Sequence, residues 1–352
     1  MSATVSSSIS QALLDWYDGH ARRLPWRIGP QDSARPDPYR VWLSEVMLQQ
    51  TTTAAVAPYF AAFTQRWPTV DALAAASEEE VMAAWAGLGY YSRARNLVKC
   101  ARVVTGRGGF PDTEAELRKL PGVGDYTAAA IAAIAFGQRA VVVDANVERV
   151  VARLFAIDAP LPGARKIIRK KADSVTPDER AGDFAQAMMD LGATICTARD
   201  AKCLLCPLSS MCEARAWGDP LGLPVKPAKK AKPRRTGTTY WIEREVDGAR
   251  AVWLVKRPAK GMLGGMRALP DDGWTARRDG DDTPPLPGAW KAAGVVRHGF
   301  THADLELAVA AFAGNAPQPE GEGEWWPLDE LDQAGLPTLF AKAAQLVLAQ
   351  RD

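Results

Sequence analysis

The sequence predicts an all-α domain followed by a smaller α+β domain. Up to about residue 215, alanine-rich segments carry apolar residues at three- and four-residue spacing, the period of helices that bury one face. After residue 236 the apolar runs are short and β-like, and Asp247 and Gly248 give a hairpin signal between two of them. Residues 226–235 (KPAKKAKPRR) contain two prolines and no large apolar residue, which predicts an extended connector.

The helical period occurs in eight stretches of the first region. These are residues 9–17, 39–63, 70–85, 94–105, 114–120, 126–135, 147–155 and 184–191. Ser77 before EEEVMAAW and Asp112–Thr113 before EAEL fit helix N-caps. In the second region, residues 238–246 and 251–256 are predicted strands, with further strand material at 308–312 and 323–328 and a closing helix at 341–349.

Composition and charge set limits on function. A chain of 352 residues with 47% hydrophobic and 24% charged residues is long enough for two or three domains. It has no apolar run near the ~20 residues of a membrane-spanning helix, which excludes a bitopic protein. The start MSATVSSSIS lacks the features of a secretory signal, so we expect a cytoplasmic protein. The net charge of +2 excludes the chain as a whole from the basic nucleic-acid binders, but residues 226–235 carry six basic residues and no acid. That segment is either a solvated linker or a phosphate contact.

Four of the five cysteines lie within seventeen residues. Cys196, Cys203, Cys206 and Cys212 form a C-x6-C-x2-C-x5-C pattern, whereas Cys100 lies alone in a helical stretch and is expected to be a small buried hydrophobe. Two disulfides are one reading, but nothing indicates an oxidising compartment. Four closely spaced thiols in such a chain favour a metal site, either a four-thiolate zinc or an iron–sulfur cluster. The spacing alone leaves these two open.

The stretch LPGVGDYTAAAIAAIAFG at 120–137 predicts a tight hairpin between two helices. Gly122 and Gly124 stand where the backbone must turn and approach a ligand, and the second helix starts at Asp125 or Tyr126. The free N–H groups of that helix then point into the hairpin and can hold a DNA phosphate without reading sequence. A G-x-G between helices is by itself a weak signal for DNA.

Two carboxylates accompany the hairpin. Glu45 lies in the apolar stretch PYRVWLSEVMLQQTT, and Asp144 follows the apolar run AVVV. A surface position for Glu45 and a purely N-capping role for Asp144 are the simple alternatives. A carboxyl group in an apolar pocket has a raised pKa and can act as a general acid near neutral pH. A second, ionised carboxylate can stabilise or attack a glycosyl cation, as in glycoside hydrolysis.

Taken together, these motifs resemble the helix-hairpin-helix DNA glycosylase superfamily and, within it, the adenine DNA glycosylase (MutY) family. The resemblance extends over LPWR at 24–27, SEVMLQQT at 44–51, GLGYYSRARNL at 87–97, LPGVGDYTA at 120–128, VVDANVERV at 142–150, FAQAMMDLGATIC at 184–196 and the four cysteines. It implies an all-α catalytic domain at 1–225, with the hairpin motif at 120–128 and a 4Fe–4S cluster loop at 196–212. A linker at 226–235 and a smaller Nudix-like domain at 236–352 follow.

The resemblance also implies a role for individual residues. Glu45 matches the acid that protonates adenine N7, Asp144 the carboxylate that stabilises the oxocarbenium sugar, and Tyr126 and Asn146 residues that support this chemistry. Arg27 and Asp190 match positions around the adenine pocket, and Asp190 is Glu in some relatives. Gln50, Thr51 and Tyr90 match residues inserted around 8-oxoguanine, and Leu88 either joins them or belongs to the core. The loop 197–211 is expected to present Arg199 and Lys202 to phosphate.

In the second region, RHGFTHADLELAV resembles the Nudix-like domain whose Phe-Ser-His element contacts 8-oxoguanine. The element here is Phe300, Thr301 and His302, so a hydroxyl is kept and a methyl group added. No stretch after residue 236 resembles the glutamate-rich metal-binding helix of Nudix hydrolases, so hydrolysis of free nucleotides is not expected.

Three function classes follow: a monofunctional adenine glycosylase, a bifunctional glycosylase/lyase and a non-catalytic DNA-binding protein. Tyr126 opposes the second, because endonuclease III-like relatives have a Schiff-base-forming lysine there and a phenol cannot replace it. The two carboxylates oppose the third. We therefore expect a monomeric base-excision repair enzyme that removes adenine mispaired with 8-oxoguanine, or with guanine, from double-stranded DNA by a retaining mechanism.

Overall fold

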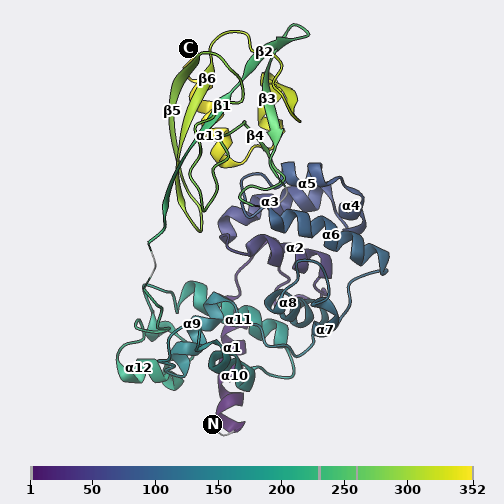
Figure 1. Cartoon of the computed structure of the whole chain (residues 1–352). Helices are drawn as coiled ribbons and strands as arrows, with labels where there is room; N and C mark the ends of the chain where they lie inside the picture. The colour runs from purple at the N-terminus through teal and green to yellow at the C-terminus, as the bar shows by residue number, and fades with distance from the viewer. Residues whose placement is uncertain (1–2, 229–230, 259–260, 351–352) are drawn as a thin grey trace. The chain divides into compact units, whose positions relative to one another are not determined.

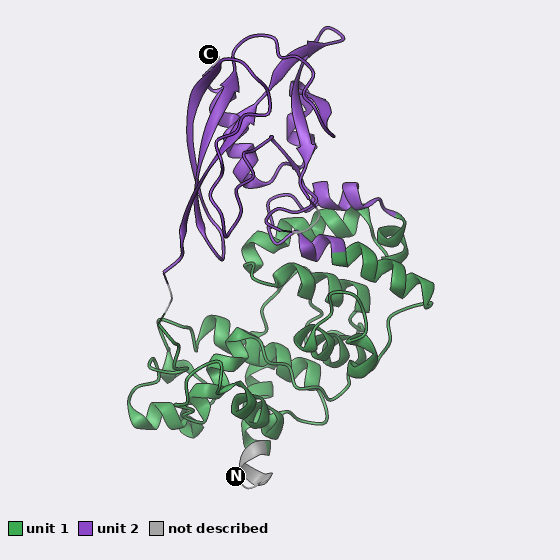
Figure 2. Ribbon diagram, viewed as in Figure 1, with its two compact units in different colours: residues 1–75, 96–229 green, residues 76–95, 230–352 purple. Residues whose placement is uncertain are grey.

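The computed structural model describes residues 3–228, 231–258 and 261–350, with side chains from Ser7 onward. The chain divides into two compact units (Figures 1 and 2). Unit 1 comprises residues 1–75 and 96–229, and unit 2 comprises residues 76–95 and 230–352. The segment 76–95 therefore groups with the C-terminal region, although it lies within the predicted N-terminal domain.

Unit 1 is helical. Its helices are α1 (Ala3–His20), α2 (Pro38–Leu48), α3 (Thr53–Arg66), α4 (Val70–Ala75), α7 (Glu114–Leu117), α8 (Asp125–Phe136), α9 (Ala145–Leu154), α10 (Arg165–Val175), α11 (Ala181–Thr194) and α12 (Glu213–Trp217). Helix α6 (Ser92–Gly106) begins in unit 2 and continues into unit 1. Helix α8 is buried almost throughout and packs against α2, α7 and α11, so it is the central helix of this unit.

Two of the predicted helices are in fact pairs of helices. The stretch 39–63 divides into α2 and α3, because Gln50 adopts a positive φ of 58° and Thr52 caps the next helix through Ala55 N–H. The stretch 70–85 divides into α4 and α5 (Glu78–Ala84), with Ser77 and Glu80 forming the capping box that starts the second helix. The Ser77 signal was therefore correct, but the unbroken helix predicted across it was wrong.

Two helices of unit 1 were not predicted. Helix α12 is a short helix between the cysteine loop, residues 196–212, and Gly218. Helix α10 buries Ile168, Ala172 and Val175, which are spaced four and three residues apart, so a helical period was present. Long basic side chains between these apolar residues hid the pattern.

Unit 2 contains two sheets and a closing helix. Its strands are β1 (Arg234–Trp241), β2 (Glu243–Val246), β3 (Ala249–Lys256), β4 (Arg267–Ala268), β5 (Trp290–Gly299), β6 (Asp304–Phe312) and β7 (Glu324–Pro327), followed by α13 (Thr338–Leu348). One sheet has the order β1-β6-β5, with β1 parallel to β6 and β5 antiparallel to it. In the other, β3 pairs with β2, β4 and β7.

The strand predictions hold in part. Asp247 and Gly248 both have positive φ, at 50° and 81°, and join β2 to β3 as a two-residue hairpin. The stretch 238–246 is two strands, because β1 ends at Trp241 and pairs in one sheet while β2 pairs in the other. Strand β5 was not predicted. The connector predicted at 226–235 ends earlier, because β1 begins at Arg234. Within the connector, Lys229 and Lys230 lie outside the described residues.

Unit 2 folds around one main apolar core. Trp241 and Trp274 are buried there together with Leu307 of β6 and Leu339 and Phe340 of α13. Helix α13 contacts β1, β5 and β6 and thereby covers one face of that sheet.

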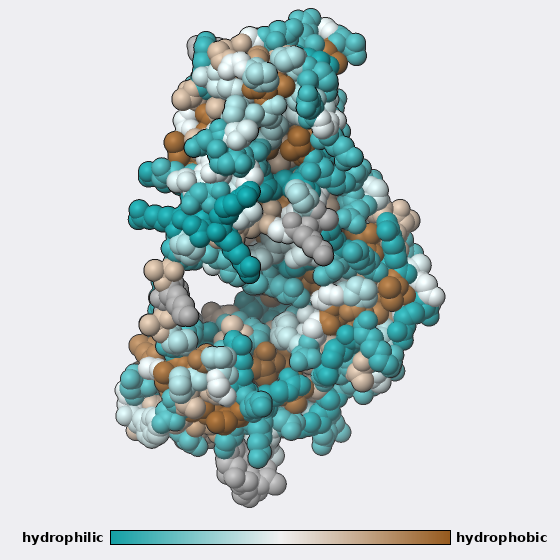
Figure 3. All heavy atoms as spheres, in the orientation of Figure 1, coloured by the Kyte–Doolittle hydropathy of each residue, from teal (hydrophilic) through white to brown (hydrophobic). Residues whose placement is uncertain are grey.

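Surface hydropathy gives one further observation on unit 1. The cysteine loop and α12 expose Leu204, Leu205 and Trp217 at 89%, 69% and 64% of their surface. In Figure 3 brown apolar atoms gather in the lower left, where Figure 1 labels α12.

No helix among the described residues is both long and apolar enough to cross a membrane.

Candidate active site

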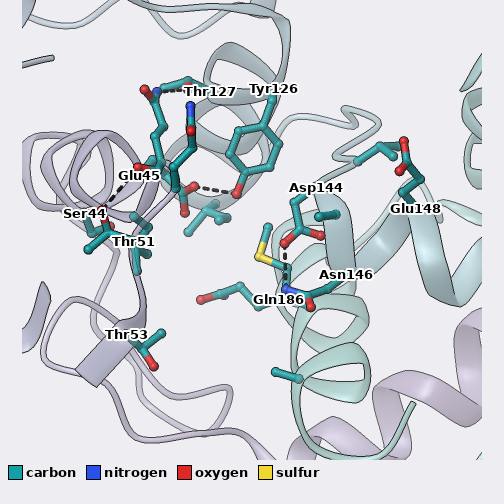
Figure 4. Close-up of a pocket in the computed structure, with 18 of the residues that line it drawn as sticks. Ser44, Glu45, Thr51, Thr53, Tyr126, Thr127, Asp144, Asn146, Glu148 and Gln186 are labelled. Atoms are coloured by element: carbon teal, nitrogen blue, oxygen red, sulfur yellow. Dashed lines mark hydrogen bonds between the residues drawn. The ribbon is translucent and has the colours of Figure 1, made fainter. Parts of the chain in front are cut away.

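A cavity of about 1070 Å³ lies within unit 1 and brings together segments far apart in the sequence. Helix α2 supplies Glu45, α8 supplies Tyr126, the start of α9 supplies Asp144 and Asn146, and α11 supplies Gln186 (Figure 4). Gln50, Thr51, Gly122 and Gly124 also line it, as does Arg27. The predicted catalytic carboxylates therefore share one cavity.

Glu45 is buried, with 6% of its surface exposed. It lies in the middle of α2, whose Val41, Trp42, Val46 and Met47 are also buried, so the side chain has little water around it. Burial raises the pKa of Glu45 to about 7, although the hydrogen bond from Tyr126 and the charge of Arg27 oppose this rise. A carboxyl group with this pKa carries its proton in a useful fraction of molecules at neutral pH.

Tyr126 is the second residue of α8 and reaches across to α2. Its phenolic Oη donates a hydrogen bond of 2.6 Å to Oε2 of Glu45 (Figure 4). Burial and the negative charges of Glu45 and Asp144 raise the pKa of Tyr126 well above its usual value. The phenol is therefore a fixed donor, and because Oε2 accepts its bond, a carboxylic proton on Glu45 belongs on Oε1.

Asp144 both caps a helix and faces the cavity. Its Oδ1 accepts the backbone N–H of Val147 at 2.7 Å, the N-cap bond of α9, while Oδ2 accepts from Nδ2 of Asn146 at 2.9 Å. Asp144 is thus an N-cap, as the simple alternative stated. The capping bond also fixes the carboxylate beside the cavity that contains Glu45.

The hairpin 120–124 needs glycine for a geometric reason. Gly122 has a φ of +75°, and a Cβ atom there would lie 2.7 Å from Cβ of Asn96. Gly124 is the N-cap of α8 and has no side chain to bond the first N–H groups of that helix. Both glycines line the cavity, so the first turn of α8 opens toward it, as an anion site requires.

Asp190 does not line the cavity. It is fully buried in α11, where its carboxylate accepts from the backbone N–H and Nε of Arg22 and from Nη1 of Arg27, at 2.6 to 2.9 Å. Arg22 and Arg27 do line the cavity. Asp190 was expected around the adenine pocket, and in this structure it holds the two arginines that line the cavity. Arg22 was not predicted, although it lies two residues before LPWR.

Polar side chains also line the cavity near the end of α2. Gln50 and Thr51 are there as expected. Gln49 was not singled out, yet its Nε2 donates to Oγ1 of Thr127 at 3.2 Å and so joins α2 to α8. Gln186 is another buried cavity residue that the motif FAQAMMDLG contained without drawing attention.

Arg149 connects the cavity to the cysteine region. Its Nη2 donates to Oδ1 of Asn146 at 2.9 Å, and its Nε donates to the carbonyl of Cys196 at 2.8 Å. One turn further along α9, the buried Arg153 donates from Nη1 to Sγ of Cys196 at 3.2 Å and to the carbonyl of Thr197 at 2.8 Å. Neither arginine was predicted, because their role depends on contacts more than forty residues away in the sequence.

The four clustered cysteines line one small cavity of about 30 Å³ in unit 1. All four are half-buried free thiols, which removes the disulfide alternative, and Cys100 is a buried thiol elsewhere. Burial raises the pKa of Cys206 to about 11, and its three neighbouring thiols add to the rise. Among the described side chains, no three His, Cys, Asp or Glu converge as ligands of a single metal ion. An enclosed set of four sulfurs, with Arg153 donating to one, has donors that suit a polynuclear cluster.

The turn between β5 and β6 lies in unit 2 and carries the predicted lesion-reading residues. Phe300 packs beside Trp274 and His298, at ring-centroid distances of 6.0 and 4.5 Å, whereas Thr301 and His302 are exposed. The hydroxyl groups of Thr301 and Tyr90 lie 2.9 Å apart.

Tyr90 and Leu88 belong to unit 2 and are not among the residues that line the cavity containing Glu45. Tyr90 is exposed, with a positive φ of 48°, and the Arg93 guanidinium lies over its ring. Leu88 is buried in this structure, in agreement with the alternative that it belongs to the core.

Comparison with known proteins defines the class. Residues 43–177 match the profile of the HhH-GPD superfamily base excision DNA repair proteins, and residues 239–346 match that of the NUDIX domain. A solved thermostable thymine-DNA glycosylase aligns over 61% of this chain and 98% of its own, at 29% identity and a TM-score of 0.54. Fold and site together define a helix-hairpin-helix DNA glycosylase with a Nudix-like C-terminal region.

Two relatives narrow the family. Human adenine DNA glycosylase is 36% identical, in an alignment that covers 97% of this chain and 74% of the relative. The Arabidopsis thaliana adenine DNA glycosylase is 41% identical over 75% of this chain and 47% of its own length. The chain belongs to the adenine DNA glycosylase family and is a DNA glycosylase of base-excision repair.

Proposed function

We propose that the protein hydrolyses the N-glycosidic bond of adenine mispaired with 8-oxoguanine, or with guanine, in duplex DNA. The observation that carries this proposal is a buried Glu45 with a pKa near 7 in the same cavity as Asp144. An acid that keeps its proton in a useful fraction of molecules at neutral pH suits a purine, which leaves readily only after protonation. The names of the curated relatives support adenine as that purine.

Glu45 and Asp144 divide the reaction between them. Glu45 gives its proton to N7 of adenine, and the electrons of the C1′–N9 bond pass to the departing base. The Asp144 carboxylate stabilises the resulting cation at C1′ and forms a covalent bond to it, as in retaining glycosidases. A water molecule then attacks C1′, and its oxygen displaces the Asp144 carboxylate. Glu45, now ionised, accepts the proton that this water loses, so both side chains return to their starting state.

Tyr126 and Asn146 act through these carboxylates. The Tyr126 bond to Oε2 fixes the rotamer of Glu45, and the Asn146 bond to Oδ2 helps to fix the orientation of the Asp144 carboxylate. Because a phenol forms no Schiff base with the sugar, we propose a monofunctional enzyme that leaves an intact abasic strand.

We further propose that Cys196, Cys203, Cys206 and Cys212 hold a 4Fe–4S cluster. A bound cluster would cross-link the loop 197–211 and so support the presentation of Arg199 and Lys202 to a DNA phosphate. Purified protein should contain about four iron atoms per chain. Cys203→Ser should lower iron content, thermal stability and DNA affinity together, whereas Cys100→Ser should leave iron content unchanged. Stoichiometric zinc without iron in anaerobically prepared protein would refute the cluster.

The lesion-reading role is proposed for two groups of residues, one in each unit. In unit 1, Arg22 and Arg27, supported by Asp190, are proposed to border the extruded adenine, and Gln50 and Thr51 to contact 8-oxoguanine. In unit 2 the proposed contacts are Tyr90, Phe300, Thr301 and His302, whereas the burial of Leu88 favours its alternative place in the core. Exposed hydroxyl, imidazole and phenol groups suit the C8 carbonyl and the N7 proton by which 8-oxoguanine differs from guanine.

A single-turnover gel assay on a duplex with one adenine opposite 8-oxoguanine tests the function. We expect strand cleavage only after alkali, since an abasic site breaks there. Glu45→Gln should slow excision by about 100- to 10,000-fold while duplex binding persists, and Glu179→Gln, which changes an exposed carboxylate between α10 and α11, should behave as the native protein. Cleavage without alkali would indicate a lyase, and substantial excision by Glu45→Gln would remove this residue from its role.

A further inference from the structure

Helix α10 carries an unusual density of positive charge. Its eleven residues, RKIIRKKADSV, include five basic side chains and one acidic one. Ile168, Ala172 and Val175 bury one face of the helix, so the charged side chains lie on its remaining surface. A charged helix surface of this kind is often only solvated. Whether it can bind an anion depends on which cavity or surface its side chains face.

Two of the five cations face the active site. Arg165 and Arg169 both line the cavity that contains Glu45 and Asp144, whereas Lys166 and Lys170 are exposed and do not line it. The two arginines are four residues apart and so lie one above the other on one side of α10. Lys171 is directed elsewhere, with its ammonium 4.9 Å from the ring centroid of Phe155.

Each arginine is held by a carboxylate that leaves it accessible. Nε of Arg165 donates to Oε2 of Glu148 at 2.9 Å, and Nη2 of Arg169 lies 3.7 Å from Oε1 of Glu114. The arginine side chains remain 67% and 46% exposed. Exposed pairs of this type contribute little to stability, and a guanidinium has five N–H donors, so one bond leaves most of them for another anion.

These carboxylates also relate α10 to the rest of the site. Glu148 is in the first turn of α9, four residues after Asp144, and Glu114 begins α7, the helix that leads into the hairpin 120–124. The arginines therefore border the same cavity as the hairpin glycines, where an extruded nucleotide would enter.

We propose that Arg165 and Arg169 bind backbone phosphates of the DNA strand that carries the target adenine. The helix thus forms a second phosphate contact, in addition to that of the hairpin. Glu148 and Glu114 pre-position the guanidinium groups in the absence of DNA. The inference rests on the proposed function only in that the cavity receives a nucleotide from duplex DNA.

The salt dependence of DNA binding tests this contact. The probe is a duplex with 2′-fluoro-2′-deoxyadenosine opposite 8-oxoguanine, because the fluorine destabilises the glycosyl cation and keeps the base attached. Each phosphate contact contributes about −0.9 to the slope of log K against log salt. Arg165→Gln with Arg169→Gln should therefore make that slope shallower by about 2 and weaken binding by roughly 10- to 60-fold at 0.1 M salt.

The matched control removes the same charge from positions about 100° further around the helix. Lys166→Gln with Lys170→Gln should leave the slope nearly unchanged, and thermal melting should show that both double variants are folded. Equal effects of the two double variants would show that α10 acts only through its overall charge and would refute the contact, as would an unchanged slope for the arginine pair. Because binding is measured without base release, failure of adenine excision would not affect this outcome.

Discussion

The hydroxyl of Tyr126 donates to Glu45 across the gap between α8 and α2, at 2.6 Å. This bond favours the ionised carboxylate and so lowers the pKa of Glu45, against the larger effect of burial, which raises it to about 7. Tyr126 therefore limits the rise in the pKa of Glu45, and it also fixes the direction of the Glu45 side chain.

The pH dependence of excision follows from this balance. In the native protein, single-turnover excision should fall about tenfold per pH unit above pH 7, as Glu45 loses its proton. Tyr126→Phe removes a bond that favours the ionised form, so the pKa of Glu45 should rise and the falling limb should move to higher pH. A profile recorded from pH 5 to 9 measures the shift. A lower rate at every pH with an unmoved limb would mean that Tyr126 only positions Glu45.

The same burial predicts that Glu45 costs stability. In the unfolded chain the group titrates near 4.5 and in the folded chain near 7. Below about pH 4.5 both states are protonated and nothing is lost. As pH rises toward 7, only the unfolded state ionises, so the free energy of unfolding decreases by about 3 kcal/mol and stays lower above pH 7.

Glu45→Gln should therefore stabilise the protein at pH 8 by about 1–3 kcal/mol, and the gain should vanish near pH 4. Urea unfolding at the two pH values measures the difference, and Glu179→Gln serves as the exposed control. A variant that is less stable than the native protein at pH 8 would contradict the raised pKa.

The sequence singled out the two carboxylates of the cavity but could not show what holds them. Glu45 and Asp144 lie in long motifs whose apolar neighbours already indicate burial. The supporting contacts join residues far apart in the chain: Arg22 to Asp190, Gln49 to Thr127 and Arg149 to Cys196. Long side chains can reach many partners, so only the packed helices select one.

Fold prediction failed where local signals were weak or competed. The break between α2 and α3 depends on the positive φ of Gln50, a conformation that glutamine rarely adopts and that no local pattern announces. Strand β5 alternates irregularly, because a bulge between Ala292 and Gly294 shifts its register against β6. The hairpin at Asp247 and Gly248 was predictable because these two residue types tolerate positive φ.

Arg149 should affect chemistry more than binding. It bonds Asn146, which orients Asp144, and also the carbonyl of Cys196, so its loss frees the catalytic side of α9 from the cysteine loop. Arg149→Gln should lower the single-turnover rate by roughly 10- to 100-fold, the effect of a small misplacement of a reacting group. Arg149→Lys should rescue little, because an ammonium cannot reproduce the fork of a guanidinium.

The control for Arg149 is Arg139→Gln, which removes an arginine whose described partners, Asp173 and Asp178, lie on the surface. Binding of the 2′-fluoro duplex should be nearly native in all three variants. If Arg149→Gln lost affinity and rate in equal proportion, the arginine would be a DNA contact rather than a positioning residue.

Lys232 supports the turn between β5 and β6. Its ammonium donates to the carbonyl of Phe300 at 2.7 Å and lies 4.0 Å from Oδ1 of Asp304. Lys232→Met should loosen the turn and reduce the preference for 8-oxoguanine over guanine opposite adenine by a few-fold, measured as the ratio of the two affinities. Lys226→Met removes the same charge from an exposed site in the same basic segment. Equal effects of the two variants would indicate a general charge effect.

Thr301 and His302 provide the direct test of lesion reading by unit 2. Both are exposed at the tip of the turn, and the Thr301 hydroxyl lies 2.9 Å from that of Tyr90. A good base-edge contact contributes about 1–3 kcal/mol of discrimination. The double change Thr301→Ala and His302→Ala should therefore reduce the preference for 8-oxoguanine over guanine at least about tenfold. It should slow saturated single-turnover excision much less, because the catalytic carboxylates belong to unit 1.

Tyr90→Phe separates the two contributions of the Thr301 hydroxyl. This variant keeps the ring under the Arg93 guanidinium and removes only the hydroxyl that lies beside Thr301. If that hydroxyl acts by positioning Thr301, Tyr90→Phe should reproduce part of the loss of preference seen in the double variant. If Thr301 contacts the lesion without help, Tyr90→Phe should leave the preference intact. An unchanged preference in the double variant would instead assign lesion reading to residues other than Thr301 and His302.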